Sequence, residues 1–565
     1  MERSDTFRAS LLAITVLALA LLPSVCAFAS WDVNGNPICT ATGDQYPPTI
    51  TSDGAGGAIT TWYDLRSGNQ DIYAQRVDAS GNVQWTTDGV AICTATGNQF
   101  YAVITSDGAG GAFIAWQDHR SGNYDIYAQR VNASGAVQWT ANGVALCTAP
   151  GSQGGPTIVS DGVGGAIVTW DDSRSGNFDI YAQRVNASGT PQWTANGVAI
   201  CTATGDQANP AIVSDGASGA IVVWWDRRVA GTSNWDVYAQ RVNASGVVQW
   251  TANGVALCTA AEDQTAAAIA SDGAGGAIVT WTDYRNGSNT DVYAQRVNAA
   301  GAVQWTANGV AVSAAAGPQW YSKIASDGSG GAIITWFDLR NGNYDIYAQR
   351  VDASGSVQWT TDGVAICIAA EFQGNPVIMS DGAGGAIIMW NDLRNMIDGD
   401  IYAQRVNASG DAQWTTDGIP VSAATGHQQD PQMASDGAGG AIVAWIDERN
   451  GNWDVYAGHI RATGPTSVPY AGAAVNTLGQ NYPNPFNPGT LIKFSVRAPG
   501  EVKLRIYDAS GQALRTLVDN WREPGEYRVT WDGKRDDGTA VASGVYFYRI
   551  ETGGLTAARK MVLLR

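Results

Sequence analysis

Acidic and basic side chains recur at fixed spacing along most of the chain and could serve acid–base chemistry or bind a metal ion. A D-x-R motif followed by a further aspartate, as in Asp64, Arg66 and Asp71, occurs eight times, and so does a Ser-Asp-Gly turn such as that of Asp53. An active site needs its acid and base once, and calcium needs about six to eight oxygens with several carboxylates. We therefore interpret the D-x-R group as an ion pair that fixes a loop within each repeat, and the Ser-Asp-Gly segment as a tight turn.

Two glutamates are the best candidates for a catalytic pair. Glu262 and Glu371 replace glycine at the same position of two repeats, and a glycosidase needs two carboxyl groups about 5–10 Å apart. The sequence does not show whether the two meet, and solvated loop acids are the favoured interpretation. The histidines, His119, His427 and His459, have no obvious partner, and no G-x-S-x-G, H-E-x-x-H or Walker motif is present. We expect no cofactor and no metal, and keep cleavage of an extracellular polysaccharide as an alternative function.

These groups belong to a unit of 54 to 57 residues that occurs eight times between residue 31 and about residue 464. Within a unit, β-branched and polar residues alternate between glycine-rich turns, which is the pattern of short antiparallel strands. Four such strands in a repeat of about 40–55 residues are typical of a β-propeller blade. We predict an all-β fold in which residues 30–464 form an eight-bladed β-propeller. In the second unit the expected strands lie at 102–106, 112–116, 125–131 and 137–147.

The last repeat is incomplete, and this predicts how the ring closes. It stops after Asp454-Val-Tyr-Ala, and the missing segment is found at the other end of the chain, as residues 31–39. An N-terminal strand that completes the last blade is required by a closed ring and not by an open solenoid. We therefore expect residues 31–39 to pair with the strand at 454–460.

Comparison of the repeats separates scaffold from surface. Tryptophans such as Trp62 and Trp85 recur in every unit, and their two series contain sixteen of the 22 tryptophans. Such large aromatics pack neighbouring sheets together. Cysteines at one position per unit, such as Cys39 and Cys93, lie too far apart across blades for a disulfide. A glutamine that recurs in every unit, beginning with Gln45, is likewise assigned to the scaffold.

The repeat units resemble those of bacterial secreted β-propeller repeat proteins over about 435 residues. In such blades the second-to-third-strand loops and the connections between blades leave on one face. Here these loops vary, whereas the turns of the opposite face hardly do. Aromatic residues that break the repeat pattern gather on the variable face, where they suit stacking on a sugar ring or contact with a peptide, or fill gaps between loops. The candidate ligand-binding residues are Tyr46, Phe100, Tyr101, Trp225, Trp235, Trp320, Tyr321 and Trp453.

The C-terminal part differs in composition from the repeats. After a linker at 465–476, the run Asn481-Tyr-Pro-Asn-Pro-Phe-Asn-Pro is followed by alternating strands that predict a small Ig-like β-sandwich at 477–565. This segment resembles the type A C-terminal sorting domain of the bacterial type IX secretion system, which is similar to the Ig-like domain of flagellar hook-capping proteins. The resemblance implies passage across the outer membrane, by contact with the secretion machinery, to the cell surface or the medium.

The N-terminal segment and the net charge further limit the classes of function that the protein can have. Residues 1–29 read as a signal peptide, with two arginines before an apolar run too short to cross a bilayer. A formal charge of −18 and the absence of a basic stripe exclude nucleic acid as a partner. We expect an exported monomer without a transmembrane segment that binds an extracellular glycan or protein, with a passive envelope component as a third possibility.

Overall fold

The computed structural model describes residues 31–228, 234–396, 398–463, 477–496, 500–522, 525–552 and 555–565. The predicted signal peptide and the linker lie outside these residues. Within the described part, the chain forms strands and turns and no helix, so none is present that could cross a membrane.

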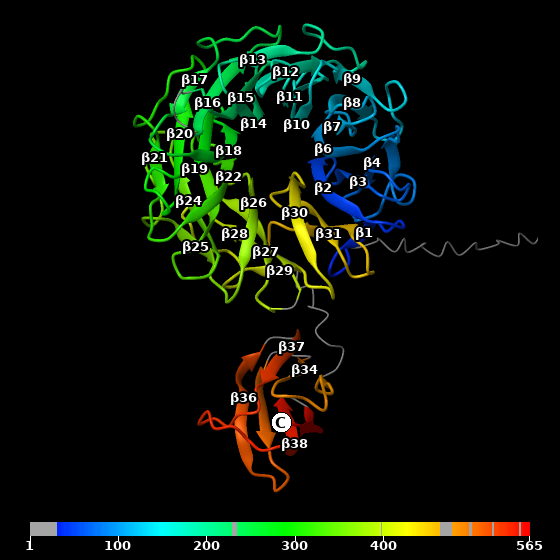
Figure 1. Ribbon diagram of the computed structural model, residues 1–565, viewed down its shortest axis with the longest axis vertical. Coiled ribbons are helices and arrows are strands. Elements are labelled where there is room, and N and C mark those ends of the chain that lie inside the picture. The colour runs from blue at the N-terminus through cyan, green and yellow to red at the C-terminus, as the bar shows by residue number, and fades with distance from the viewer. Residues whose placement is uncertain are drawn as a thin grey trace, which may run out of the picture.

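Strands β1 to β32 form eight four-stranded antiparallel sheets, arranged as the blades of a ring with the first strand of each blade nearest the centre (Figure 1). The inner strands are β2 (Gln45–Ser52), β6 (Gln99–Ser106), β10 (Gln153–Ser160), β14 (Gln207–Ser214), β18 (Gln264–Ser271), β22 (Gln319–Ser326), β26 (Gln373–Ser380) and β30 (Gln428–Ser435). The second strands are β3 (Ala58–Asp64), β7 (Ala112–Asp118), β11 (Ala166–Asp172), β15 (Ala220–Asp226), β19 (Ala277–Asp283), β23 (Ala332–Asp338), β27 (Ala386–Asp392) and β31 (Ala441–Asp447). The third strands are β4 (Asp71–Val77), β8 (Asp125–Val131), β12 (Asp179–Val185), β16 (Asp236–Val242), β20 (Asp291–Val297), β24 (Asp345–Val351), β28 (Asp400–Val406) and β32 (Asp454–Ile460). The outer strands are β5 (Val90–Cys93), β9 (Val144–Cys147), β13 (Val198–Cys201), β17 (Val255–Cys258), β21 (Val310–Ser313), β25 (Val364–Cys367), β29 (Ile419–Ser422) and β1 (Asn36–Cys39).

The predicted ring closure is confirmed. Strand β1 pairs antiparallel with β32, with Asn36 opposite Ala457 and Cys39 opposite Val455. The Asn34 carbonyl, just before β1, accepts a hydrogen bond of 2.7 Å from Arg449 of the last blade. The two ends of the repeat region therefore form one blade.

The outer strand is shorter than the sequence predicts. In the second blade, β9 covers only residues 144–147, and Val137 makes a single isolated bridge to Val131. The chain turns away in between because Gly143 lies over the indole of Trp116, where a Cβ would come within 2.5 Å of the ring. Trp116 itself is fully buried, and the glycine, which recurs at this place in every repeat, gives it room against its own blade.

The D-x-R group forms the predicted ion pair, but it also joins two blades. Asp64 accepts a hydrogen bond of 2.9 Å from the indole of Trp62 and pairs with Arg66 at 2.6 Å. Arg66 also donates to the Sγ of Cys39, on the outer strand of the preceding blade, at 3.1 Å. The prediction of a group acting within one repeat was therefore too narrow. Asp71 is not part of the pair and instead accepts a hydrogen bond from Ser67.

The Ser-Asp-Gly aspartate builds a second seam on the opposite face. Asp53 accepts backbone N–H bonds from its own turn and pairs with Arg76 at 2.9 Å. Arg76 also donates to the Ala133 carbonyl of the next blade, which accepts the indole N–H of Trp85 as well. In the last blade a histidine takes the place of the arginine, and His459 lies 2.9 Å from Asp436. We call these two sets of contacts the seams.

The cysteines of the repeats are buried and free. Burial raises the pKa of Cys39 to about 12, so its thiol stays protonated and packs as a small apolar group. The equivalent thiols behave in the same way.

The C-terminal domain consists of β33 (Thr477–Leu478), β34 (Thr490–Val496), β35 (Gly500–Tyr507), β36 (Ala513–Arg522), β37 (Gly525–Trp531), β38 (Gly544–Thr552) and β39 (Leu555–Leu563). One sheet has the order β33-β34-β37 and the other β36-β35-β38-β39. Trp531, Tyr548 and Phe494 fill the core between them. This is the predicted small β-sandwich.

Candidate functional site

The loops that vary in sequence meet at one end of the ring, as expected. The connection into the second blade lies against the loops of two blades, because Asn98 accepts the backbone N–H of His119 at 2.9 Å and Gln99 donates to Gln70 at 2.7 Å. The inner strands begin at this end, and their starts surround the opening at the centre of the ring of strands (Figure 1).

Each inner strand carries a bulge just inside this opening. In β6 the pairing register shifts between Phe100 and Val103, and Tyr101 between them has a φ of 52°. Tyr321 has a φ of 51° in the same position of β22. Side chains rarely adopt this left-handed conformation, which tends to persist where a function uses it. We call the eight residues at this position the mouth ring: Pro47, Tyr101, Gly155, Asn209, Ala266, Tyr321, Asn375 and Asp430.

The bulge turns the mouth-ring side chains out of the sheet. Tyr101 and Tyr321 are 62% and 60% exposed, among the most exposed large side chains of the described propeller. The glutamine two positions earlier is the same residue in all eight blades and is fully buried, whereas the mouth ring holds six residue types. The mouth ring is thus a variable position of the inner strand, and the position before it, from Tyr46 to Gln429, varies as well.

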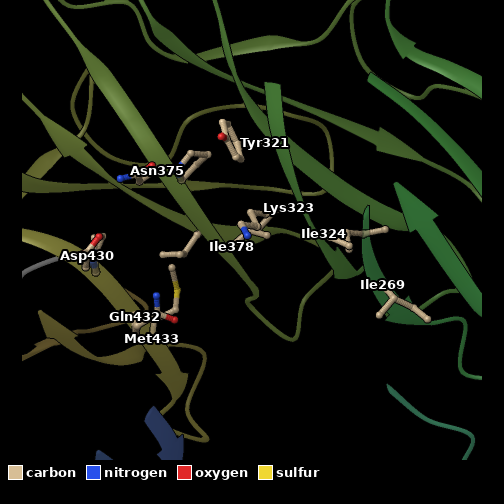
Figure 2. Close-up of a pocket in the computed structure, with 13 residues that line it drawn as sticks. Ile269, Tyr321, Lys323, Ile324, Asn375, Ile378, Asp430, Gln432 and Met433 are labelled. Carbon is tan, nitrogen blue, oxygen red and sulfur yellow. The ribbon is translucent and has the colours of Figure 1, made fainter. Parts of the chain in front are cut away.

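A pocket of about 450 Å³ opens below part of the mouth ring, between β18, β22, β26 and β30. Figure 2 shows Tyr321, Asn375 and Asp430 at its edge and Lys323, Ile378 and Met433 among its lining residues. Burial lowers the pKa of Lys323 and raises that of Asp430. The pocket therefore combines an aromatic ring, an amide, two ionisable groups and an apolar wall.

Two further ionisable groups lie beside the mouth ring. Burial raises the pKa of Tyr63 to about 12, and the neighbouring Tyr46, Tyr101 and Asp430 add to the effect. Burial also raises the pKa of Asp171 to about 7, although the backbone N–H of Asn209 partly opposes this. The Oδ1 of Asp171 has no hydrogen-bond partner within the described structure. Asp171 therefore keeps its proton to a higher pH than an ordinary aspartate does.

The predicted aromatic residues fall into two groups. Tyr101 and Tyr321 belong to the mouth ring, and Tyr321 lines the pocket. Tyr46, Phe100 and Trp320 stand one position earlier, are half-buried and pack against other rings; Trp320, for example, lies 6.0 Å from Phe337 between ring centroids.

The remaining predicted residues lie in or beside the loops of the same face. Trp225 and Trp235 meet edge to face at 6.2 Å, and Arg227 lies 4.1 Å over the ring of Trp235. The insertion at 229–233 is outside the described residues. Trp453 is half-buried at the junction of the last and first blades, where its carbonyl accepts the N–H of Gln45 at 2.7 Å.

The glutamates lie outside the pocket. Glu262 and Glu371 are exposed and have φ values of 62° and 70°, at the loop position that most blades fill with glycine. Neither lines the pocket, and their role as a catalytic pair stays a prediction. Within the described structure, no group of three or more His, Cys, Asp or Glu residues is placed to hold a metal ion.

Sequence reasoning missed Lys323, Asn375, Asp430 and Asp171 because it searched for aromatic residues. A comparison of the repeats column by column would have found them. The third residue of the inner strand differs between most blades, and so does the sixth residue of the second strand, where Asp171 stands; Lys323 is the only lysine of the repeats.

Comparison with known proteins adds little about this site. Among solved structures, the polysaccharide lyase Uly1 matches with 10% identity over 76% of this chain and 100% of its own, at a TM-score of 0.41. An ulvan lyase bound to GlcA(1-4)Rha3S matches with 11% identity over 76% and 94%, at 0.37. A protein of unknown function from Dyadobacter fermentans matches with 10% identity over 56% and 98%, at 0.34. At these scores the likenesses carry no argument about ligand or activity.

No curated protein matches the chain. Among family models, that of the FlgD Ig-like domain matches residues 487–554. This agrees with the β-sandwich of the C-terminal part and says nothing of the ring, which remains a β-propeller without an assigned family.

Proposed function

We propose that the propeller is a binding module that holds an extracellular glycan at the mouth of its central channel. The mouth ring carries this proposal, because its residues differ from blade to blade and its two tyrosines are exposed. Its residues include two exposed tyrosines, two asparagines and an aspartate. Flat aromatic faces stack on sugar rings, and amide and carboxylate groups hydrogen-bond to hydroxyls, so the set suits a carbohydrate better than an apolar ligand.

A glycan array probed with residues 30–464 tests this proposal. We expect selective binding that weakens when Tyr321 is replaced by alanine, because Tyr321 lies at the pocket edge and is 60% exposed. Val163 is a matched control, since it is 67% exposed in a turn of the opposite face. Binding that Val163→Ala weakens and Tyr321→Ala does not would place the ligand on the other face. Absence of binding to every glycan would favour a protein ligand or a passive envelope role.

Cleavage of the glycan is a second candidate, and Asp171 is the observation that favours it. The mouth-ring position above it is Gly155, where a Cβ would lie 3.4 Å from the Asp171 carboxylate. A carboxyl group with a pKa of about 7 beside the mouth ring is suited to general acid catalysis. Release of reducing ends or unsaturated products from a bound glycan, lost in Asp171→Asn, would establish this activity.

We also propose that the chain is exported and that residues 477–565 direct it through the type IX secretion machinery. The support is the ordered series of motifs from Asn481 to Arg565 together with the Ig-like sandwich. In a host that carries this system, a chain that ends at residue 476 should fold and stay in the periplasm. Normal delivery of the shortened chain to the surface would contradict the proposal.

A further inference from the structure

The pocket contains the only lysine of the repeat region, Lys323. The chain has five lysines, and Lys323 is the only one before residue 493. It stands in an acidic protein of formal charge −18. The other inner strands carry uncharged residues at the same position: Thr49, Val103, Thr157, Ala211, Ala268, Val377 and Gln432.

The Lys323 ammonium has no counter-ion in the described structure. The ion pairs that involve lysine, Lys503 with Asp519 and Lys534 with Asp532, are in the C-terminal domain. Asp430 lines the same pocket but forms no ion pair with Lys323, and burial alone accounts for the altered pKa of each group. Every arginine of the seams, in contrast, pairs with an aspartate.

The surroundings of Lys323 make an anionic ligand favourable. The Lys323 side chain is exposed within the pocket, the apolar side chains of Ile324, Ile378 and Met433 line the walls around it, and burial lowers its pKa (Figure 2). A partly desolvated charge without a partner raises the free energy of the protein. An anion that enters the pocket recovers this cost in a charge-assisted hydrogen bond.

We propose that the pocket holds an acidic sugar residue, with its carboxylate or sulfate group at the Nζ of Lys323 and its ring against Tyr321. The inference rests on glycan binding at the mouth and names the class of glycan. Asp430 repels an anion from the other edge of the pocket, so the two charges together fix the orientation of the sugar (Figure 2).

Calorimetric titration of the propeller with three soluble polymers tests this. A polyuronate supplies carboxylates, a sulfated dextran supplies sulfate esters, and unmodified dextran supplies neither. We expect the propeller to prefer one of the two acidic polymers, and the better of the two identifies the anionic group. In Lys323→Met, which keeps the length of the side chain and removes its charge, this affinity should fall by about tenfold or more, as for the loss of a hydrogen bond to a charged group. Lys323→Arg should retain most of it.

The outcomes separate this inference from the proposed function. If Lys323→Met binds the acidic polymers as tightly as the native propeller, or if only neutral glycans bind, the assignment of Lys323 is wrong while glycan binding stands. If no glycan of any kind binds, both fail. As a second readout, an acylating reagent should label Lys323 in the native propeller, and the preferred polymer should protect it; labelling that is unaffected by the polymer would count against the site.

Discussion

The seams and the mouth ring lie close to one another in every blade, but they differ in two respects. The residues of the seams are repeated and their charges are paired, whereas those at the mouth vary and include charges without a partner in the described structure. In the seams, one arrangement is repeated around the ring, and every aspartate pairs with an arginine, as Asp64 and Asp53 do, except Asp436, which pairs with His459. At the mouth, the residues differ from blade to blade, and Lys323, Asp430 and Asp171 have no oppositely charged partner among the described residues. In this fold, the candidate site is therefore identified by residues that take no part in the repeated contacts of the scaffold.

The largest expected effect is on the closing seam. Deletion of residues 30–40 removes β1 and the hydrogen bond from Arg449 to Asn34, so one blade loses its outer strand. We expect the melting temperature of the propeller to fall by about 10 °C or more, or melting to lose its cooperativity. Differential scanning calorimetry measures this, and deletion of residues 477–565 is the control that should leave the transition of the ring in place. An unchanged transition after the N-terminal deletion would mean that the ring does not depend on this strand.

Two adjacent tryptophans, Trp224 and Trp225, allow a direct comparison of a seam residue with a residue near the mouth. Trp224 is fully buried and donates to Asp226 at 2.8 Å, whereas Trp225 is half-buried and its indole N–H has no partner in the described structure. We expect Trp224→Ala to cost about 3–5 kcal/mol of unfolding free energy without a specific effect on binding. Trp225→Ala should lower the unfolding free energy clearly less than Trp224→Ala does. It should weaken the binding of any glycan that reaches this blade. Denaturant unfolding and titration of both variants check this; equal losses of stability would remove the distinction between the two positions.

The raised pKa of Asp171 predicts that this carboxyl group lowers the stability of the fold at neutral and higher pH. Its folded pKa of about 7 lies above the ordinary aspartate value of 3.8, so between these two values the folded state binds more protons than the unfolded state. Stability should therefore decline as pH rises from about 4 to about 7 and stay reduced above. Asp171→Asn should remove this decline and raise the unfolding free energy at pH 8 by about 1–4 kcal/mol. Unfolding curves at pH 4.5 and pH 8 measure it, and a loss of stability at pH 8 would contradict the account.

The smallest effect is expected where a histidine interrupts the seams. His459 pairs with Asp436 and lies beside Trp31, in the place that arginine takes in the other blades. Arginine keeps its charge at every relevant pH and can also reach a carbonyl of the next blade. We expect His459→Arg to raise the unfolding free energy by about 0.5–1 kcal/mol at pH 8. His459→Gln, which cannot carry charge, is the control; a gain from both would point to packing rather than charge.

Much of the fold can be predicted from the sequence because it is repeated. The permuted segment at 31–39 predicts ring closure, and the recurring Asp64 and Arg66 predict an ion pair. The bulge of the inner strands cannot be predicted from the repeat pattern. A left-handed backbone conformation is usually indicated by glycine, and here tyrosine, asparagine, alanine and aspartate adopt that conformation. The strand ends were therefore misplaced, with β6 beginning at Gln99 rather than near residue 102.

The candidate site was predicted in part. The face and two mouth-ring tyrosines, Tyr101 and Tyr321, follow from aromatic residues that interrupt the repeat. The packing of Trp320 against Phe337 depends on contacts between strands, which a search for unusual aromatics does not reveal. Lys323 and Asp430 come together across separate blades, so their shared pocket depends on the closed ring.

The central claim, that the ligand lies at the mouth ring, is tested most directly by one comparison of affinities. The double variant Tyr101→Ala/Tyr321→Ala removes both exposed rings and leaves the seams intact. Calorimetric titration with the glycan that binds the native propeller best should give a loss of about 1–3 kcal/mol for each stacked tyrosine, with an unchanged melting temperature. Native affinity in a fully folded double variant would contradict the claim.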